Sequence, residues 1–447
     1  MTRDPDSIQS RVTAFLRSID HPLLTKYFTL ACFSTPPVLG SLFSFILSGG
    51  SLEGLYQVCR GATRLSRDRA MIQLTVAIYL YCTAYLASLF LNPMPAGSLH
   101  YFWPVLTFIL FPFLYSRWSE GGRQTVARSV VLASMAGCFG AFALAAFQYH
   151  YLGIRAEGGA GNAIIFATVT CLAASVCLAG IFVLEKAFSA WLVAAFAAGT
   201  MAILYSGSRI IWLVLAINVI AILIVHRDRW WLRASFWMTA CVALTIAGTV
   251  AVGTEVMPVR INALAHDWQQ LSQQGQYDSS LGRRIALWKA AVEIAEEKML
   301  LGHGPQATKQ LIRDHFPGTN GLELFYSHFH NGFITAWVEV GLLGMFALAA
   351  IFVVAARIAV RTLAATDDPV GRLGASMLLV LVTTYVIGGL TGIIVGHDIL
   401  DTVLMSFLVV GAFLSSGAVA DVDHATRKQT GLVPDEGSQQ NPQIQSD

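Results

Sequence analysis

Charged residues are scarce in this sequence. Asp, Glu, Lys and Arg make up 13% of its 447 residues and hydrophobic residues 55%, whereas a soluble protein usually carries about 25% charged residues. The mean hydropathy is +0.59, and several apolar runs approach the roughly 20 residues that cross a bilayer as a helix. The composition therefore excludes an ordinary soluble protein and predicts an integral membrane protein.

Three other features are missing. The seven cysteines include no C-x-x-C pair, so they suggest buried apolar side chains and neither a zinc site nor a disulfide framework. The alternating pattern of membrane-barrel strands is absent. Residues 1–20 are polar and lack the apolar core of a signal peptide, so we expect them to remain in the mature chain.

Apolar segments predict the helices of the fold. They lie at 27–47, 70–91, 100–116, 128–149, 163–184, 187–205, 209–226, 234–253, 331–356, 373–394 and 398–417. Pro36 and Pro37 offer an alternative, because proline ends or kinks helices, and would divide the first segment into two short spans. The predicted fold class is an all-α, polytopic membrane protein with about 11–12 transmembrane helices.

Basic residues alternate between successive connections and set the predicted orientation. They recur at Arg117, Arg123, Arg128, Lys186, Arg227, Arg229, Arg233, Arg357, Arg361, Arg372, Arg427 and Lys428. The positive-inside rule places these connections in the cytoplasm. We therefore expect a cytoplasmic segment at 1–26, a transmembrane bundle at 27–253, a large outward loop at 254–330, transmembrane helices at 331–417 and a disordered cytoplasmic tail at 418–447.

The outward loop has helical patterns of its own. Apolar residues recur at three- and four-residue spacing between Ile285 and Met299 and predict a helix at about 281–299. Pro305 favours the start of a second, short helix. The loop also holds five of the eleven histidines. We expect it to be a small folded helical cap on the membrane domain.

Two polar motifs stand where apolar spans begin. "YSGSRIIWLVL" places Arg209 at the start of a span, where a guanidinium either snorkels to the interface or binds an anion such as phosphate bidentately. "HFHNGFITAWVEVGLLG" begins with His328, His330 and Asn331. Histidine there is either an interfacial or capping residue or a catalytic group. A metal site of both histidines with Glu323 or Asp314 is a weaker alternative. Glu339, inside the apolar run, would pair with an arginine or line a cavity.

Together these motifs resemble a known family. "HNGFITAWVEVGLLG", "SGSR" at the head of a helix and "GRRIALWKAAVEIAEEKMLLGHG" are similar to the signatures of the O-antigen ligase and polymerase family of bacterial envelope polysaccharide synthesis. The resemblance implies a bacterial inner-membrane enzyme with its active site facing the periplasm. It further implies transfer of a glycan from undecaprenyl diphosphate to an acceptor, without a nucleotide sugar, nucleotide or divalent metal as cofactor.

The resemblance also assigns roles to residues. His330 matches the family's essential histidine, and Arg209 and Arg284 match its essential arginines. A histidine suits a general base that deprotonates the acceptor hydroxyl at neutral pH, and two guanidiniums suit a leaving diphosphate. We also expect His328, Arg283 and Asn331 to contact substrate, although Arg283 has the alternative of a solvated neighbour of Arg284.

The acceptor separates two hypotheses within the family. A ligase transfers the glycan to a lipid A core sugar, whereas a polymerase transfers it to another lipid-linked repeat unit. The expected partners are therefore the lipid-linked donor, a lipid A core or glycan acceptor, and membrane lipid, with no nucleic acid. A transporter or channel is the alternative of another class, disfavoured by the single large loop and the absence of visible repeats.

Overall fold

The structure, a computed structural model, describes residues 21–94, 98–229, 262, 266–269, 271–273, 279–316 and 326–429, with the side chains of the last helix to Ser416. These residues are mostly helical and contain no β-strand, which confirms the all-α fold class. The predicted span at 234–253 and most of the segment from 254 to 278 lie outside the described residues.

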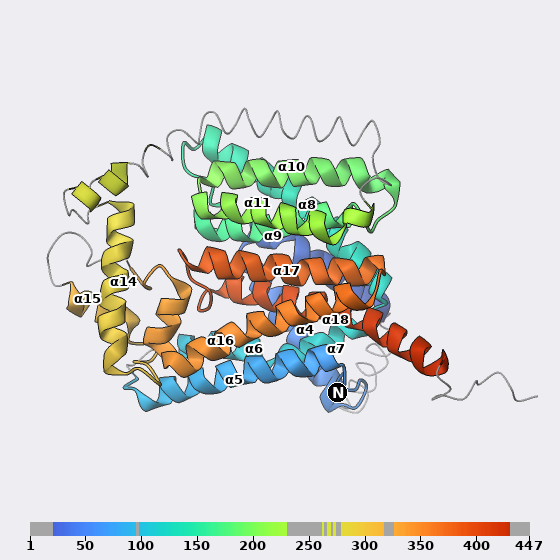
Figure 1. Cartoon of the computed structure of the whole chain (residues 1–447), viewed down its shortest axis with the longest axis horizontal. Helices are drawn as coiled ribbons and strands as arrows, with labels where there is room; N and C mark the ends of the chain where they lie inside the picture. Colours follow the sequence, from blue (N-terminus) through green and yellow to red (C-terminus); the bar gives the residue numbers. More distant parts are fainter. Residues whose placement is uncertain are drawn as a thin grey trace, which may run out of the picture.

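Eight helical segments in the described residues are long and apolar enough to cross a membrane, which confirms a polytopic membrane protein. They comprise α5 (Arg69–Leu91), the segment Leu99–Ser119 with α6 (Trp103–Ile109) and α7 (Phe111–Ser119), α8 (Arg123–His150), α9 (Ala163–Gly180), the segment Lys186–Ser206 with α10 (Ser189–Ser206), α16 (Gly332–Ala365), α17 (Pro369–Gly389) and the first part of α18 (Asp398–Gln429). Helix α11 (Arg209–Val225) is apolar but shorter. These helices run side by side across Figure 1.

The first apolar segment is broken at its prolines. Helix α2 (His21–Ser34) ends before a one-turn helix α3 (Pro36–Leu39), and α4 (Leu42–Cys59) follows after Gly40. The break at Pro36 and Pro37 is therefore confirmed and a single continuous helix over 27–47 is wrong, but neither α2 nor α4 is among the described helices that are long and apolar enough to cross a membrane. The reason is local, because proline lacks the amide proton that continues a helix and clashes with the preceding turn.

One end of the bundle gathers the arginines of the basic connections. Arg117 pairs with Glu53 at 2.6 Å, and Arg123 pairs with Asp368 at 2.7 Å. Arg372, on α17, pairs with Asp367 and donates to the carbonyl of Val225 at 2.7 Å. Contacts between α4 and α7, between α8 and the segment before α17, and between α17 and α11 thus bring these connections to a common end. Helix α18 continues beyond this end to Gln429, past the expected boundary at 417, and residues 430–447 lie outside the described residues.

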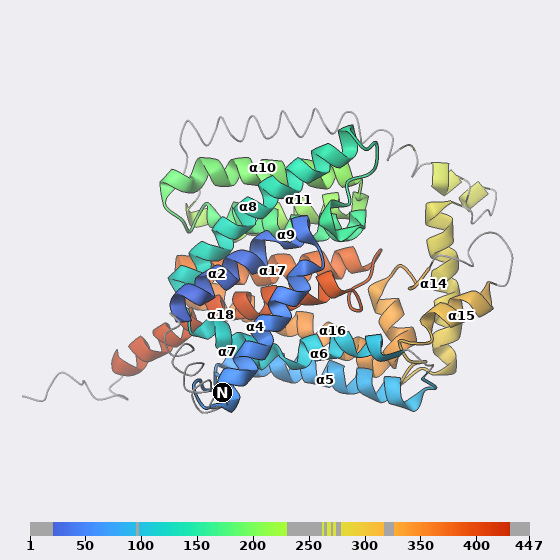
Figure 2. The same ribbon diagram turned by 180° about the vertical axis from the view of Figure 1, so that it is seen from behind.

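A helical cap covers the other end of the bundle. Helix α14 (Ser280–Glu297) stands across the ends of the bundle helices, with α15 (Thr308–His315) beside it, as both views show (Figures 1 and 2). The cap core consists of Leu287, Ala291, Ile294, Ala295, Ile312, Phe329 and Val338. Both helices agree with the predicted cap, since α14 follows the expected range of 281–299 closely.

The cap is fastened to the bundle where α16 is interrupted at Gly341. Gly341 has a φ of 68° inside an otherwise helical run. Backbone groups released by this break bond to the turn after α14: His303 N donates to the Val338 carbonyl at 2.8 Å, and Leu342 N donates to the Met299 carbonyl at 2.9 Å. A Cβ on Gly341 would lie 2.1 Å from the oxygen of Leu300. The spaced glycine of the motif therefore allows the cap to dock.

Candidate functional site

The segment before α16 carries the imidazoles of His328 and His330, and Phe329 between them anchors the segment in the cap core. Phe329 is fully buried in the cap core, and its amide donates to Thr335 Oγ1 at 3.2 Å. Asn331 caps α16, since its Oδ1 accepts from the amides of Phe333 and Ile334 at 3.0 and 3.1 Å. The anchor and the cap hold His328 and His330 in place between them.

His330 has an unusual backbone conformation. Its φ of 51° is positive, which no other non-glycine residue shows in the described part of the chain. Left-handed backbone costs about 1–2 kcal/mol for a residue with a Cβ, and such strain concentrates at functional sites. The ring lies 4.5 Å from that of His328 and 4.9 Å from that of Tyr326, between centroids. Its Nδ1 is buried and makes no hydrogen bond to any residue that the structure describes, which leaves it available to a ligand.

Both imidazoles are neutral at pH 7. Burial, with the neighbouring His328 and then the Arg284 charge, lowers the pKa of His330 from 6.5 to about 3. Burial and the Arg284 charge, with a smaller effect of His397, lower the pKa of His328 to about 4. The physical reason is that burial and nearby cations both disfavour the imidazolium.

Two of the predicted arginines come together beside these histidines. Arg209 is the first residue of α11, and Arg284 lies on α14. Burial lowers the pKa of Arg284, the charge of Arg209 lowers it further, and Tyr326 acts in the opposite direction. No carboxylate within the described ranges forms an ion pair with Arg284. Two guanidinium charges close enough to affect one another, next to neutral imidazoles, make a region that favours a bound anion.

Asn331 and Arg283 are the other two residues predicted to contact substrate. Asn331 uses its side-chain oxygen as the α16 cap, which leaves its NH₂ group as a donor. Arg283 is half-buried, and its Nε makes no hydrogen bond within the described ranges; like Arg209 and Arg284, it does not line the cavity described below. Glu339 accepts a hydrogen bond from Thr308 of α15 at 2.8 Å, so it joins the cap to α16 rather than pairing with an arginine.

A cavity of about 210 Å³ adjoins the two histidines. Its walls come from the start of α9, the end of α17, the turn at 390–397 and the segment before α16. His328 and His330 line it from one side and His397 from another. Sequence reasoning missed His397, although "GHDIL" places an imidazole immediately before a span, as "HFHNG" does. The same criterion applied to every span would have found it.

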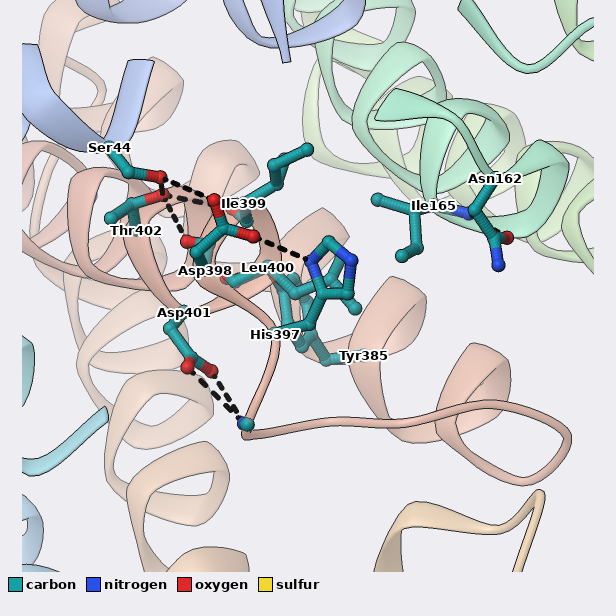
Figure 3. Close-up of polar contacts among 11 residues, drawn as sticks. Ser44, Asn162, Ile165, Tyr385, His397, Asp398, Ile399, Leu400, Asp401 and Thr402 are labelled. Atoms are coloured by element: carbon teal, nitrogen blue, oxygen red, sulfur yellow. Dashed lines mark hydrogen bonds and ion pairs between the residues drawn. The ribbon is translucent and has the colours of Figure 1, made fainter. Parts of the chain in front are cut away.

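His397 is held at the start of α18. Its Nδ1 lies 3.2 Å from Oδ1 of Asp398, and Oδ2 of Asp398 accepts from Ser44 Oγ at 3.4 Å, as Figure 3 shows. Both carboxylate oxygens of Asp401 accept from the amide of Gly396, at 3.1 and 3.2 Å. Asp401 thus fixes the turn that presents the imidazole. Burial lowers the pKa of His397, and Asp398 partly offsets this.

The part of the chain that the structure describes contains no cluster of side chains for the alternative metal site. No group of three or more His, Cys, Asp or Glu side chains there has an arrangement that could hold a metal ion. Glu323, one of the two ligands considered with the histidines, lies outside the described residues.

Comparison with known proteins agrees with the motifs. Residues 193–349 match the family model described as O-Antigen ligase, a segment that contains Arg209, Arg284, His330 and Gly341. The resemblance to an O-antigen ligase-like family is confirmed over this segment. An uncharacterized protein of Haemophilus influenzae is 26% identical over 150 residues, which are 32% of this chain and 36% of that protein. The chain is therefore similar to the O-antigen ligase family over about a third of its length, and the alignment spans about a third of the relative.

Proposed function

We propose that this protein transfers a glycan from undecaprenyl diphosphate to a hydroxyl group of an acceptor sugar. The observation that carries the proposal is that the charge of Arg284 acts on both Arg209 and His330, next to the cavity that His330 lines. The arginines bind the diphosphate, and His330 accepts the proton of the attacking hydroxyl. The lipid A core is the proposed acceptor, which makes the protein an O-antigen ligase.

The reaction is a single displacement at the anomeric carbon. The acceptor oxygen forms a bond to this carbon as the bond from the carbon to the diphosphate oxygen breaks. The bonding electrons leave with undecaprenyl diphosphate, and the hydroxyl proton moves to the imidazole of His330. One displacement inverts the anomeric configuration. The guanidiniums stabilise the charge that develops on the leaving group, so the step requires no metal.

Substrate binding would make His330 a better base. With no anion bound, burial and the Arg284 charge hold its pKa at about 3. A bound diphosphate places negative charge next to Arg284, and a nearby negative charge raises the pKa of an imidazole. His330 is therefore a stronger base when the donor is bound. Without the donor its low pKa keeps the imidazole unprotonated.

Purified protein tests the proposal directly. It should join a labelled glycan, supplied on undecaprenyl diphosphate, to lipid A core in the presence of EDTA, with the His330→Asn variant as the inactive control. A transporter would form no new glycosidic bond, so labelled donor recovered unchanged would refute the proposal. Loss of activity in EDTA with recovery on adding a divalent cation would refute metal independence.

The acceptor can be identified in cells that lack this protein. A ligase deletion accumulates polymer on undecaprenyl diphosphate, whereas a polymerase deletion leaves single repeat units on the lipid. We expect accumulated polymer. Single repeat units would assign the same chemistry to chain elongation.

Orientation has a separate test. The proposal places the cap in the periplasm and the arginine-rich end in the cytoplasm, in accord with the positive-inside rule. Lys309 on α15 and Arg64 in the connection before α5 are both exposed. A Lys309→Cys variant should react with a membrane-impermeant thiol reagent in spheroplasts, and Arg64→Cys only after lysis. The reverse pattern would overturn the orientation.

A further inference from the structure

The cavity beside His330 has room that the proposed diphosphate site does not use. Its volume of about 210 Å³ is many times the roughly 10–15 Å³ that one water molecule needs. Glycines form much of the wall contributed by α17 and the following turn: Gly388, Gly389, Gly392 and Gly396. Residues without side chains leave backbone groups accessible at this wall. Such a cavity suits a compact polar ring.

The cavity lining separates two groups of residues, because His328, His330 and His397 line the cavity whereas Arg209 and Arg284 do not. Arg284 is close enough to lower the pKa of both His328 and His330, and Arg209 is close enough to lower the pKa of Arg284. The arginine pair therefore lies outside the cavity near these two histidines, whereas His397 lies on the cavity wall. In a displacement reaction, the leaving group and the attacking hydroxyl lie on opposite sides of the reacting carbon. With the diphosphate at the arginines, the attacking hydroxyl belongs on the side of His397.

Polar groups for a sugar are available on that side. Figure 3 shows the His397 ring between Asp398 and the start of α9, where Asn162 and Ile165 lie. The Oδ1 atom of Asn162 accepts from the amides of Ile164 and Ile165, so its NH₂ group remains a donor. Nδ1 of His397 lies 3.2 Å from Oδ1 of Asp398 at an angle that makes no hydrogen bond, but the carboxylate charge still favours a proton on Nδ1 and leaves Nε2 as an acceptor for a hydroxyl proton.

We propose that the cavity between α9, α17 and the 390–397 turn is the binding subsite for the acceptor sugar, with His397 as an acceptor-binding residue. This proposal rests on the proposed glycosyl transfer. A sugar hydroxyl in this subsite hydrogen-bonds to His397, while a second hydroxyl of the same ring is presented to His330. The subsite thereby selects which hydroxyl reacts.

Two kinds of variant test the subsite. His397→Ala removes the hydrogen bond, and His397→Gln retains a side-chain acceptor. Gly392→Ala and Gly392→Leu fill the cavity progressively, and the fold accepts the first, because a Cβ there meets neighbours only at 3.4 Å or more. Gly49→Ala and His100→Ala are the matched controls: a Cβ on Gly49 meets nothing within 4 Å, and neither residue lines the cavity.

Initial rates are measured with glycolipid acceptor extracted from cells lacking this protein, varied at saturating labelled undecaprenyl-diphosphate glycan. We expect His397→Ala to raise the KM for the acceptor about five- to tenfold, as for one lost hydrogen bond, with partial recovery in His397→Gln. Gly392→Ala and Gly392→Leu should raise the KM for the acceptor in order of side-chain size. Binding of undecaprenyl diphosphate should stay at the wild-type level.

The outcomes separate this inference from the proposed function. An unchanged acceptor KM in His397→Ala and Gly392→Leu, with wild-type transfer intact, would overturn the subsite alone. A raised KM for the donor in place of the acceptor would assign the cavity to the donor sugar and also overturn it. Absence of transfer by the wild-type protein would instead refute the glycosyltransferase itself.

Discussion

The two ends of the bundle use arginine in opposite ways. At the end away from the cap, Arg117, Arg123 and Arg372 each lie against a carboxylate. At the cap end, the charge of Arg284 lies near that of Arg209. Pairing with a carboxylate stabilises a buried guanidinium, whereas the nearby charge of Arg209 disfavours the charged form of Arg284, a cost that a bound anion would offset. The difference distinguishes arginines that hold helices together from the two arginines that we propose bind the diphosphate.

Histidine gives a second comparison between the same ends. His226, at the arginine-rich end, is fully buried, stacks on Phe182 at 4.7 Å and has its pKa lowered to about 3 by burial and then by Arg372 and Arg229. His330 has an equally low pKa. The low pKa therefore does not identify a functional histidine. What distinguishes His330 from His226 is the cavity that it lines and its left-handed backbone, and on these we base the proposed role of His330.

The largest expected effect comes from replacing His330, with a replacement of His226 for comparison. His330→Asn should lower turnover about 100- to 10,000-fold, the usual loss for a general base, while asparagine tolerates the left-handed backbone and preserves the fold. Turnover per folded protein and the midpoint of thermal unfolding in detergent are measured for each variant. His226→Ala should do the reverse, with a lower midpoint and normal turnover. Normal turnover in well-folded His330→Asn would exclude the base.

Arginine-to-lysine changes should give the next effect. Arg209→Lys and Arg284→Lys keep the charge but lose the planar fork that binds a diphosphate bidentately, so turnover should fall about 10- to 100-fold, as for losing a charge-assisted hydrogen bond. Affinity for undecaprenyl diphosphate should fall in parallel. Arg128→Lys is the control, because its ion pair with Glu185 is exposed and worth about 0–1 kcal/mol. Unchanged product affinity in both test variants would refute the phosphate role.

A change at Gly341 should affect activity through the docking of the cap. Gly341→Ala places a Cβ 2.1 Å from the Leu300 oxygen and adds about 1–2 kcal/mol for the positive φ alone. We expect a lower thermal midpoint and faster proteolysis of the cap, with reduced turnover. Gly49→Ala, in open space on α4, should leave all three measurements unchanged. Wild-type cap stability in Gly341→Ala would show that the break in α16 does not fasten the cap.

The smallest predicted effect is a pH dependence of stability. The folded-state pKa values of His328 and His330, about 4 and 3, lie below the ordinary value of 6.5. From about pH 7 to about pH 5 the unfolded chain therefore takes up protons that the folded protein does not, and stability falls. The thermal midpoint should decline less steeply in the His328→Gln/His330→Asn double variant than in the wild type. Equal slopes would contradict the low pKa values.

Local pattern was sufficient for much of the fold. Apolar length predicted the spans, three- and four-residue spacing predicted α14, and the motifs identified Arg209, Arg284 and His330 as one candidate set. The first span was less certain because Pro36 and Pro37 admit two readings. The candidate site was only partly predictable, because Asn331 caps a helix and Glu339 bonds to the cap, and both roles depend on neighbours in space.

The sequence by itself determined which segments are apolar enough to enter a membrane and which polar residues stand at their ends, because both properties depend on neighbours along the chain. Tertiary structure alone decided that His397 shares a cavity with His330, that both imidazoles are neutral, and that Gly341 interrupts α16 to receive the cap. Each of these depends on burial, or on contacts between helices far apart in the sequence. Burial sets the free energy of a charge, and packing decides which backbone groups exchange a helical hydrogen bond for a tertiary one.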